Sequence, residues 1–212
     1  SGQKCSAQSI LFVHENWEKD LIPRLAELAS KRKLKDLNIG PVLTWSNSQI
    51  KDHLDSLLKI KGSKLLFGGK ELSDHSIPVS YGSIQPTAIQ VPIKELLTTN
   101  FELITKELFG PFQIIISYSD KEIDQMKKIL EKITQNLTAA IVSNDTFFQQ
   151  DILANTVNGT TYTGMRARTT GAPQNHWFGP SGDPRSAGIG TPEAIINTWS
   201  AHREIIKDSG PQ

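Results

Sequence analysis

The chain is poor in cysteine, in net charge and in long apolar runs. Cys5 is the single cysteine among 212 residues, which excludes an intrachain disulfide and a multi-cysteine zinc site. The formal net charge of +1 gives no electrostatic reason to expect nucleic acid or a membrane surface as a partner. No apolar run approaches the roughly 20 residues of a membrane span, and no signal or transit peptide is recognisable at the start. The five histidines lack metal-ligand spacing, so no metal site is expected.

Short apolar runs alternate with amphipathic stretches over most of the chain. The runs typical of strands are 9–14, 64–67, 87–93, 112–118, 139–143 and 157–162. The stretches between them carry apolar residues at helical spacing. This alternation predicts an α/β fold with an open, largely parallel sheet flanked by helices.

The expected helix boundaries follow from capping residues and breakers. Asn16 or Asp20 is expected to cap the first helix, with Pro23 tolerable only in its first turn. Ser119 and Glu122 form the pattern of a capping box. A helix is expected through 102–108, ended by Gly110-Pro111.

Regular patterning stops over 164–190, where glycine and proline are frequent. A long loop of this kind inside a compact domain is usually functional or disordered, and the pair Trp177-Phe178 argues against disorder. A last strand is expected within 199–207, where it could pair with another subunit. We therefore expect one domain over 1–198 and an oligomerisation strand and tail over 199–212.

Three strings carry candidate chemistry. Cys5 stands beside Lys4 among small residues, an environment that favours a reactive thiolate, although a lone cysteine is often a buried, inert side chain. Glu107 can accept hydrogen bonds from two hydroxyl groups, as a ribose offers them, and Phe109 could pack on a flat ring. The turn at 169–172 could hold an anion on its backbone N–H groups. A solvated glutamate, a core phenylalanine and an ordinary turn are the plain alternatives.

Together the strings resemble a known enzyme family. Gly2-Gln3-Lys4-Cys5-Ser6-Ala7 is similar to the catalytic-cysteine segment of aldehyde dehydrogenases, and Glu107-Leu108-Phe109-Gly110-Pro111 matches their Glu-x-Phe-Gly-Pro motif. The loop Thr169 to Gly179 resembles the substrate-carboxylate loop of the 1-pyrroline-5-carboxylate dehydrogenases, and 8–17 looks like their plant-type branch. The resemblance runs over nearly the whole chain.

The resemblance assigns a role to each site residue. It implies that Cys5 is the nucleophile, Glu107 binds the nicotinamide ribose and Phe109 supports the nicotinamide of NAD. The residues implied to hold the substrate are Ser6, Gly171 and Ala172 at its carboxylate and Phe178 at the wall of the aldehyde pocket. Ala172 stands where a serine is frequent in the family, so one hydroxyl contact is missing.

The implied reaction is NAD-dependent oxidation of glutamate 5-semialdehyde, the open form of 1-pyrroline-5-carboxylate, to glutamate in proline catabolism. The resemblance further implies a mitochondrial enzyme and a homo-oligomer. In the family a dinucleotide-binding domain and a general-base glutamate precede the cysteine, and these 212 residues contain neither. We therefore expect little turnover from these residues alone. Two alternatives stay open: an incompetent domain that keeps only the substrate pocket and the subunit interface, and an aldehyde dehydrogenase of other specificity.

Overall fold

The computed structural model describes residues 2–134, 136–169, 196, 203 and 205. The chain divides into two compact units, Ser1–Ile133 and Thr134–Gln212, each with a sheet of its own. The predicted boundary after residue 198 and the predicted last strand lie outside the continuously described residues.

The sheet of the first unit has four strands in the order β1-β4-β3-β2. These are β1 Ile10–His14, β4 Phe112–Tyr118, β3 Thr87–Gln90 and β2 Lys64–Phe67. β1, β4 and β3 run parallel, and β2 is antiparallel to β3. The predicted α/β fold with a largely parallel sheet is therefore confirmed.

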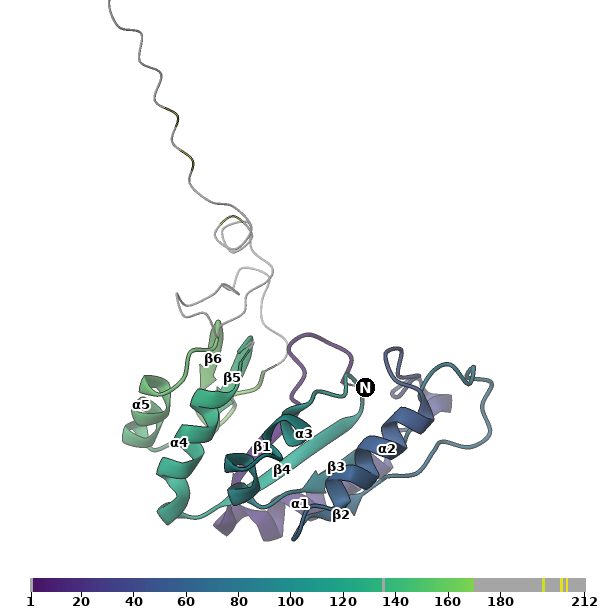
Figure 1. Ribbon diagram of the computed structural model, residues 1–212, viewed down its shortest axis with the longest axis horizontal. Coiled ribbons are helices and arrows are strands. Elements are labelled where there is room, and N and C mark those ends of the chain that lie inside the picture. The colour runs from purple at the N-terminus through teal and green to yellow at the C-terminus, as the bar shows by residue number, and fades with distance from the viewer. Residues whose placement is uncertain (1, 135, 170–195, 197–202, 204, 206–212) are drawn as a thin grey trace, which may run out of the picture. The chain divides into compact units, whose positions relative to one another are not determined.

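Helices cover both faces of this sheet (Figure 1). They are α1 Glu15–Ser30, α2 Asn47–Leu58, α3 Phe101–Thr105 and α4 Ile123–Lys132, with the short 3-10 helices η1 Leu34–Asp36, η2 Ile93–Leu97 and η3 Asp120–Glu122. On the α1 face, Leu21 and Leu25 pack against a cluster of Val13, Ala88 and Ile115 from three adjacent strands. The helical spacing of these α1 residues is thus explained by burial against the sheet.

The start of α1 differs from the prediction. The cap is His14, whose ring accepts a hydrogen bond from the backbone N–H of Asn16, so neither Asn16 nor Asp20 caps the helix. Pro23 lies inside α1 instead of in its first turn. Pro23 and Lys19, whose carbonyl loses its helical partner, are both exposed, so water can satisfy that carbonyl. Packing of the apolar face outweighs the missing hydrogen bond.

Two other helix starts have capping boxes. Ser46 and Gln49 form one at α2. Ser119 and Glu122 form the predicted capping box, although its first turn is the 3-10 helix η3 and α4 begins only at Ile123.

The helix expected through 102–108 is shorter than predicted. α3 ends at Thr105, and Lys106 is already extended. Leu108 is only 3% exposed, so the chain leaves the helix and buries this side chain before β4 begins. As a result Glu107 lies in a loop and not on a helix.

The described part of the second unit is a strand-helix-strand motif. β5 Thr138–Ile141 and β6 Thr160–Thr163 are parallel, and α5 Thr146–Ala154 connects them. Asp145 caps α5 by accepting hydrogen bonds from the backbone N–H groups of Phe147 and Phe148. Within the described residues, no helix is both long and apolar enough to cross a membrane.

Candidate functional site

The two strongest strings meet at one edge of the sheet. Residues 2–9 lead directly into β1, and Glu107–Pro111, here named the Glu107 loop, leads directly into β4. β1 and β4 are parallel neighbours, so their preceding segments arrive at the same, amino-terminal edge. The backbone N–H of Ile114 donates to the carbonyl of Ser9 over 3.0 Å, which continues the pairing towards Cys5.

Gly2 and Gly110 bring the two segments into direct backbone contact. A β-carbon on Gly2 would lie 2.0 Å from the carbonyl oxygen of Gly110, closer than any side chain permits. Gly2 also has a φ of 73°, in the left-handed region that favours glycine. Glycine is therefore required here for two independent reasons, and the contact fixes the start of the cysteine segment on the Glu107 loop.

The side chain of Gln3 ties the same segment to residues 41–43. Its Nε2 donates to the carbonyl of Pro41 over 2.6 Å, and its Oε1 accepts from the N–H of Leu43 over 2.9 Å. Val42 between them is fully buried, and a β-carbon on Gly110 would lie 2.9 Å from its side chain. Three segments distant in sequence are thus packed together beneath the candidate site.

Cys5 lies in a turn at this edge. The N–H of Ala7 donates to the carbonyl of Lys4 over 2.8 Å and closes the turn. The Cys5 thiol is free and exposed, so the alternative of a buried, inert cysteine does not hold. The thiol is therefore accessible to a substrate. Ser6 is buried in this structure, being only 3% exposed, and its contact with the substrate carboxylate stays a prediction.

The Glu107 loop, which contacts the cysteine segment at Gly2, carries a carboxylate and an aromatic ring. Glu107 is exposed and Phe109 is half-buried. Leu108 between them is buried and anchors the loop in the core. An exposed carboxylate can accept ribose hydroxyls and a half-exposed ring can support a flat heterocycle, so these residues fit a nicotinamide nucleotide.

Only one of the predicted substrate-binding residues lies in the described part of the chain. Ser6 belongs to the described segment, whereas Gly171, Ala172 and Phe178 lie outside the described residues. The structure therefore brings together the segments of Cys5, Ser6, Glu107 and Phe109. The role of the loop at 169–179 stays a prediction.

One group beside the site was not predicted. His53 of α2 is only 6% exposed and packs between the rings of Trp45, at 5.5 Å, and Phe112, at 5.6 Å. Burial, and then the nearby charge of Lys106, lowers the pKa of His53 below its ordinary value. The signal was present in the sequence, because His53 stands three residues after Ile50 and four before Leu57, on the apolar stripe of the helix.

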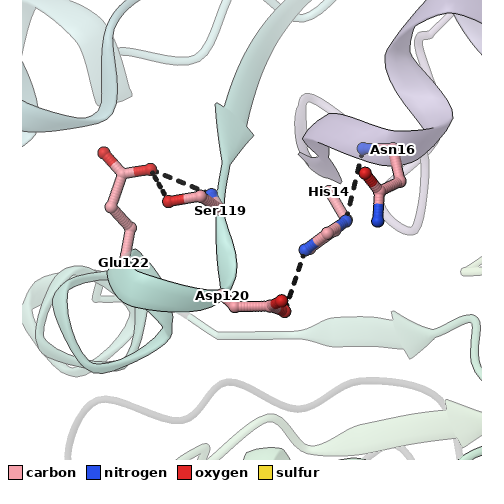
Figure 2. A network of polar contacts seen from close by, with 5 residues as sticks. All are labelled: His14, Asn16, Ser119, Asp120 and Glu122. Atoms are coloured by element: carbon pink, nitrogen blue, oxygen red, sulfur yellow. Dashed lines mark hydrogen bonds and ion pairs between the residues drawn. The ribbon is translucent and has the colours of Figure 1, made fainter.

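The carboxyl-terminal edge of the same strands carries a different, purely polar arrangement (Figure 2). His14 Nε2 lies 3.1 Å from Asp120 Oδ1, while its Nδ1 accepts from the N–H of Asn16. The neutral ring therefore carries its hydrogen on Nε2. Burial, followed by the charge of Asp120, raises the pKa of Tyr118, whose ring meets His14 edge to face at 5.3 Å.

A second polar group at that edge joins α1 to the sheet. Gln90 Nε2 donates to Glu18 Oε1 over 2.9 Å and to Ser117 Oγ over 2.5 Å. Burial by itself raises the pKa of Glu18, but hydrogen bonds from Gln90 and Ser117 and the charge of Lys64 outweigh it and lower that pKa. Sequence reasoning did not single out this group, because its members are scattered over α1, β2, β3 and β4.

Comparison with known proteins gives the same family as the motifs. The profile of the aldehyde dehydrogenase family matches residues 1–187. Delta-1-pyrroline-5-carboxylate dehydrogenase 12A1, mitochondrial, from Arabidopsis thaliana is 61% identical over 214 residues, which is 100% of this chain and 38% of that protein.

Solved structures with the same fold are more distant in sequence. Glyceraldehyde-3-phosphate dehydrogenase GapN from Methanocaldococcus jannaschii, complexed with NADP, has a TM-score of 0.66 at 21% identity and covers 84% of this chain and 36% of its own. An NAD+ complex of aldehyde dehydrogenase from Bacillus cereus has a TM-score of 0.64 at 18% identity, with coverages of 84% and 34%. The chain thus spans well under half of the length of each of these proteins.

Proposed function

Because this chain belongs to the aldehyde dehydrogenase family, we propose that it carries the thiol and part of the cofactor site for NAD-dependent oxidation of glutamate 5-semialdehyde to glutamate. The observation that carries the proposal is the contact of Gly2 with Gly110, which holds the segment of the exposed Cys5 on the Glu107 loop. The name of the Arabidopsis relative supports this substrate.

In the proposed reaction the Cys5 thiolate attacks the aldehyde carbon, and the new S–C bond gives a hemithioacetal whose oxygen carries the charge. The backbone N–H of Cys5 can help to stabilise that oxygen. The bound cofactor supplies an acceptor for the hydride that leaves this carbon. The thioester left on Cys5 is hydrolysed by water, which releases the carboxylate and restores the thiol.

The other residues bind and orient. Glu107 holds ribose hydroxyls and Phe109 supports the nicotinamide ring. Ser6, Gly171 and Ala172 hold the substrate carboxylate, and Phe178 forms a wall of the aldehyde pocket. NAD is proposed over NADP from the sequence resemblance; the two structural relatives are complexed with NADP and with NAD+. The mitochondrial location follows the name of the Arabidopsis relative, and a homo-oligomer is proposed from the C-terminal strand.

The test uses a chimera in which these 212 residues replace the matching segment of the Arabidopsis relative. We expect NADH formation with glutamate 5-semialdehyde and a lower kcat/KM with a simple aliphatic aldehyde of similar length. These 212 residues by themselves should give little NADH. An active chimera that prefers the aliphatic aldehyde would reject the carboxylate-anchor assignment.

A related aldehyde dehydrogenase of other specificity is the second candidate. It is favoured by Ala172, which offers no hydroxyl to a carboxylate. Ala172→Ser in the chimera distinguishes the two. If the carboxylate is anchored at this turn, the added hydroxyl should lower the KM for glutamate 5-semialdehyde and leave that for the aliphatic aldehyde unchanged.

A further inference from the structure

Both ends of the Glu107 loop rest on the same pair of side chains beside α2. Before the loop, Lys106 Nζ lies 4.9 Å from the ring centroid of Trp45. After the loop, Phe112 packs against His53 at 5.6 Å. The ring centroids of Trp45 and His53 lie 5.5 Å apart in a tilted arrangement, so a continuous series of contacts, here called the stack, joins the two ends. An ammonium group over an indole face is attracted to it, and tryptophan is the ring that binds a cation best.

The centre of the stack is buried, and one end of it is exposed to solvent. His53 and Phe112 are each 6% exposed, and Phe112 is the first residue of β4. Among the described residues His53 Nε2 has no hydrogen-bond partner, so this side of the ring is held by packing and not by a hydrogen bond. Lys106, at the other end of the stack, is exposed to solvent. Its contact with Trp45 therefore holds the exposed end of the Glu107 loop.

We propose that Trp45 and His53 are positioning residues that hold the Glu107 loop, through Lys106 and Phe112, in the geometry that binds the nicotinamide nucleotide. This inference rests on the proposed function. Lys106 and Glu107 are adjacent, so release of Lys106 frees the backbone that orients the Glu107 carboxylate. The expected contribution is to nucleotide binding, because the loop that these groups hold carries Glu107 and Phe109.

A matched pair of variants separates this role from general stability. Lys132 Nζ lies 4.3 Å from the ring centroid of Phe101, a second cation–ring contact that joins α4 to α3 and leaves the Glu107 loop untouched. Lys106→Met and Lys132→Met each remove one ammonium group from an aromatic ring. Lys106→Arg keeps a cation that can stack on Trp45.

Kinetics of the chimera provide the test. Loss of a single cation–ring contact should raise the KM for NAD about three- to tenfold in Lys106→Met, with kcat changed less than about twofold. Lys132→Met should leave the KM for NAD unchanged, and Lys106→Arg should restore most of the loss. Thermal unfolding of the variants controls for stability.

The outcomes distinguish the two levels of the argument. A wild-type chimera that forms no NADH with any aldehyde contradicts the proposed function. An active chimera in which Lys106→Met and Lys132→Met have equal KM values for NAD contradicts the positioning role only. A fall in kcat without a change in KM for NAD would also reject it.

Discussion

The two ends of the parallel strands are built in different ways. At the carboxyl-terminal edge polar side chains form hydrogen bonds with one another. His14 pairs with Asp120, and Gln90 donates to Glu18. At the amino-terminal edge the backbones of Gly2 and Gly110 touch, and Cys5 stands exposed above them. In open α/β sheets ligands usually bind at the carboxyl ends of strands. Here the family motifs lie at the opposite edge, so the proposed site differs from the one that fold analogy alone would suggest.

Of the substitutions at the two edges, loss of the Cys5 thiol should have the largest effect on activity. Cys5→Ser in the chimera should lower kcat for aldehyde oxidation by at least about a thousandfold, because the covalent intermediate cannot form efficiently. Initial rates of NADH formation measure this. Glu18→Gln at the opposite edge is the control and should keep the activity within about twofold. Comparable losses in both variants would remove the distinction between the edges.

The contact between Gly2 and Gly110 should be the next most sensitive feature. Gly2→Ala adds a β-carbon where the Gly110 carbonyl stands and imposes a side chain on a positive φ. We expect a loss of about 2–4 kcal/mol in the free energy of unfolding, measured by denaturant titration of the 212-residue chain.

Gly40→Ala is the matched control for that substitution. A β-carbon on Gly40 would meet nothing within 4 Å. Its effect should stay within about 0.5 kcal/mol. Equal stabilities of the two alanine variants would contradict the close backbone contact.

The sequence predicted some elements around the candidate site more accurately than others. Local signals predicted the exact bounds of β4, because Gly110-Pro111 and Ser119 flank a run rich in isoleucine and aromatic residues. They placed Glu107 on a helix wrongly, since the burial of Leu108 that ends α3 is a tertiary effect.

The candidate site was found through motifs and not through periodicity. Cys5, Glu107 and Phe109 were singled out from short strings, but their meeting depends on the order of β1 and β4 in the sheet. Strand order is a long-range property that hydrophobic patterning does not encode. For the same reason the Gln90–Glu18 pair was not predicted. The Trp45–His53 contact is local in sequence, but helical spacing indicates only that His53 is buried and does not specify its ring partners.

The carboxyl-terminal edge should contribute stability in a pH-dependent way. The pKa of Glu18 is lowered, so its stabilising effect is complete above its ordinary value of 4.5 and is lost as the pH falls through the folded-state value. Glu18→Gln should cost about 1 kcal/mol at neutral pH. Denaturant unfolding of both chains should show that the difference shrinks below about pH 4.5; a constant difference would show that the carboxylate charge is not involved.

The smallest effect is expected from the titration of His53. Its pKa is lowered below 6.5, so the folded state favours the neutral ring. Above pH 6.5 the titration of His53 should not affect the free energy of unfolding. As the pH drops from 6.5 towards the folded-state pKa, that free energy should fall. His53→Gln should flatten this part of the profile of unfolding free energy against pH. An unchanged slope would show that other groups cause it.

The central claim is that the Cys5 turn and the Glu107 loop form one site. Because Cys5 is the only cysteine of this chain, its labelling by a thiol reagent reports on that turn in a chimera whose remaining cysteines have been replaced by serine. If the turn and the loop form one site, NAD should change the labelling rate of Cys5, Glu107→Gln should abolish this response, and Glu18→Gln should preserve it. A labelling rate that does not change with NAD, or that responds equally in both variants, would show that the turn and the loop do not form one site.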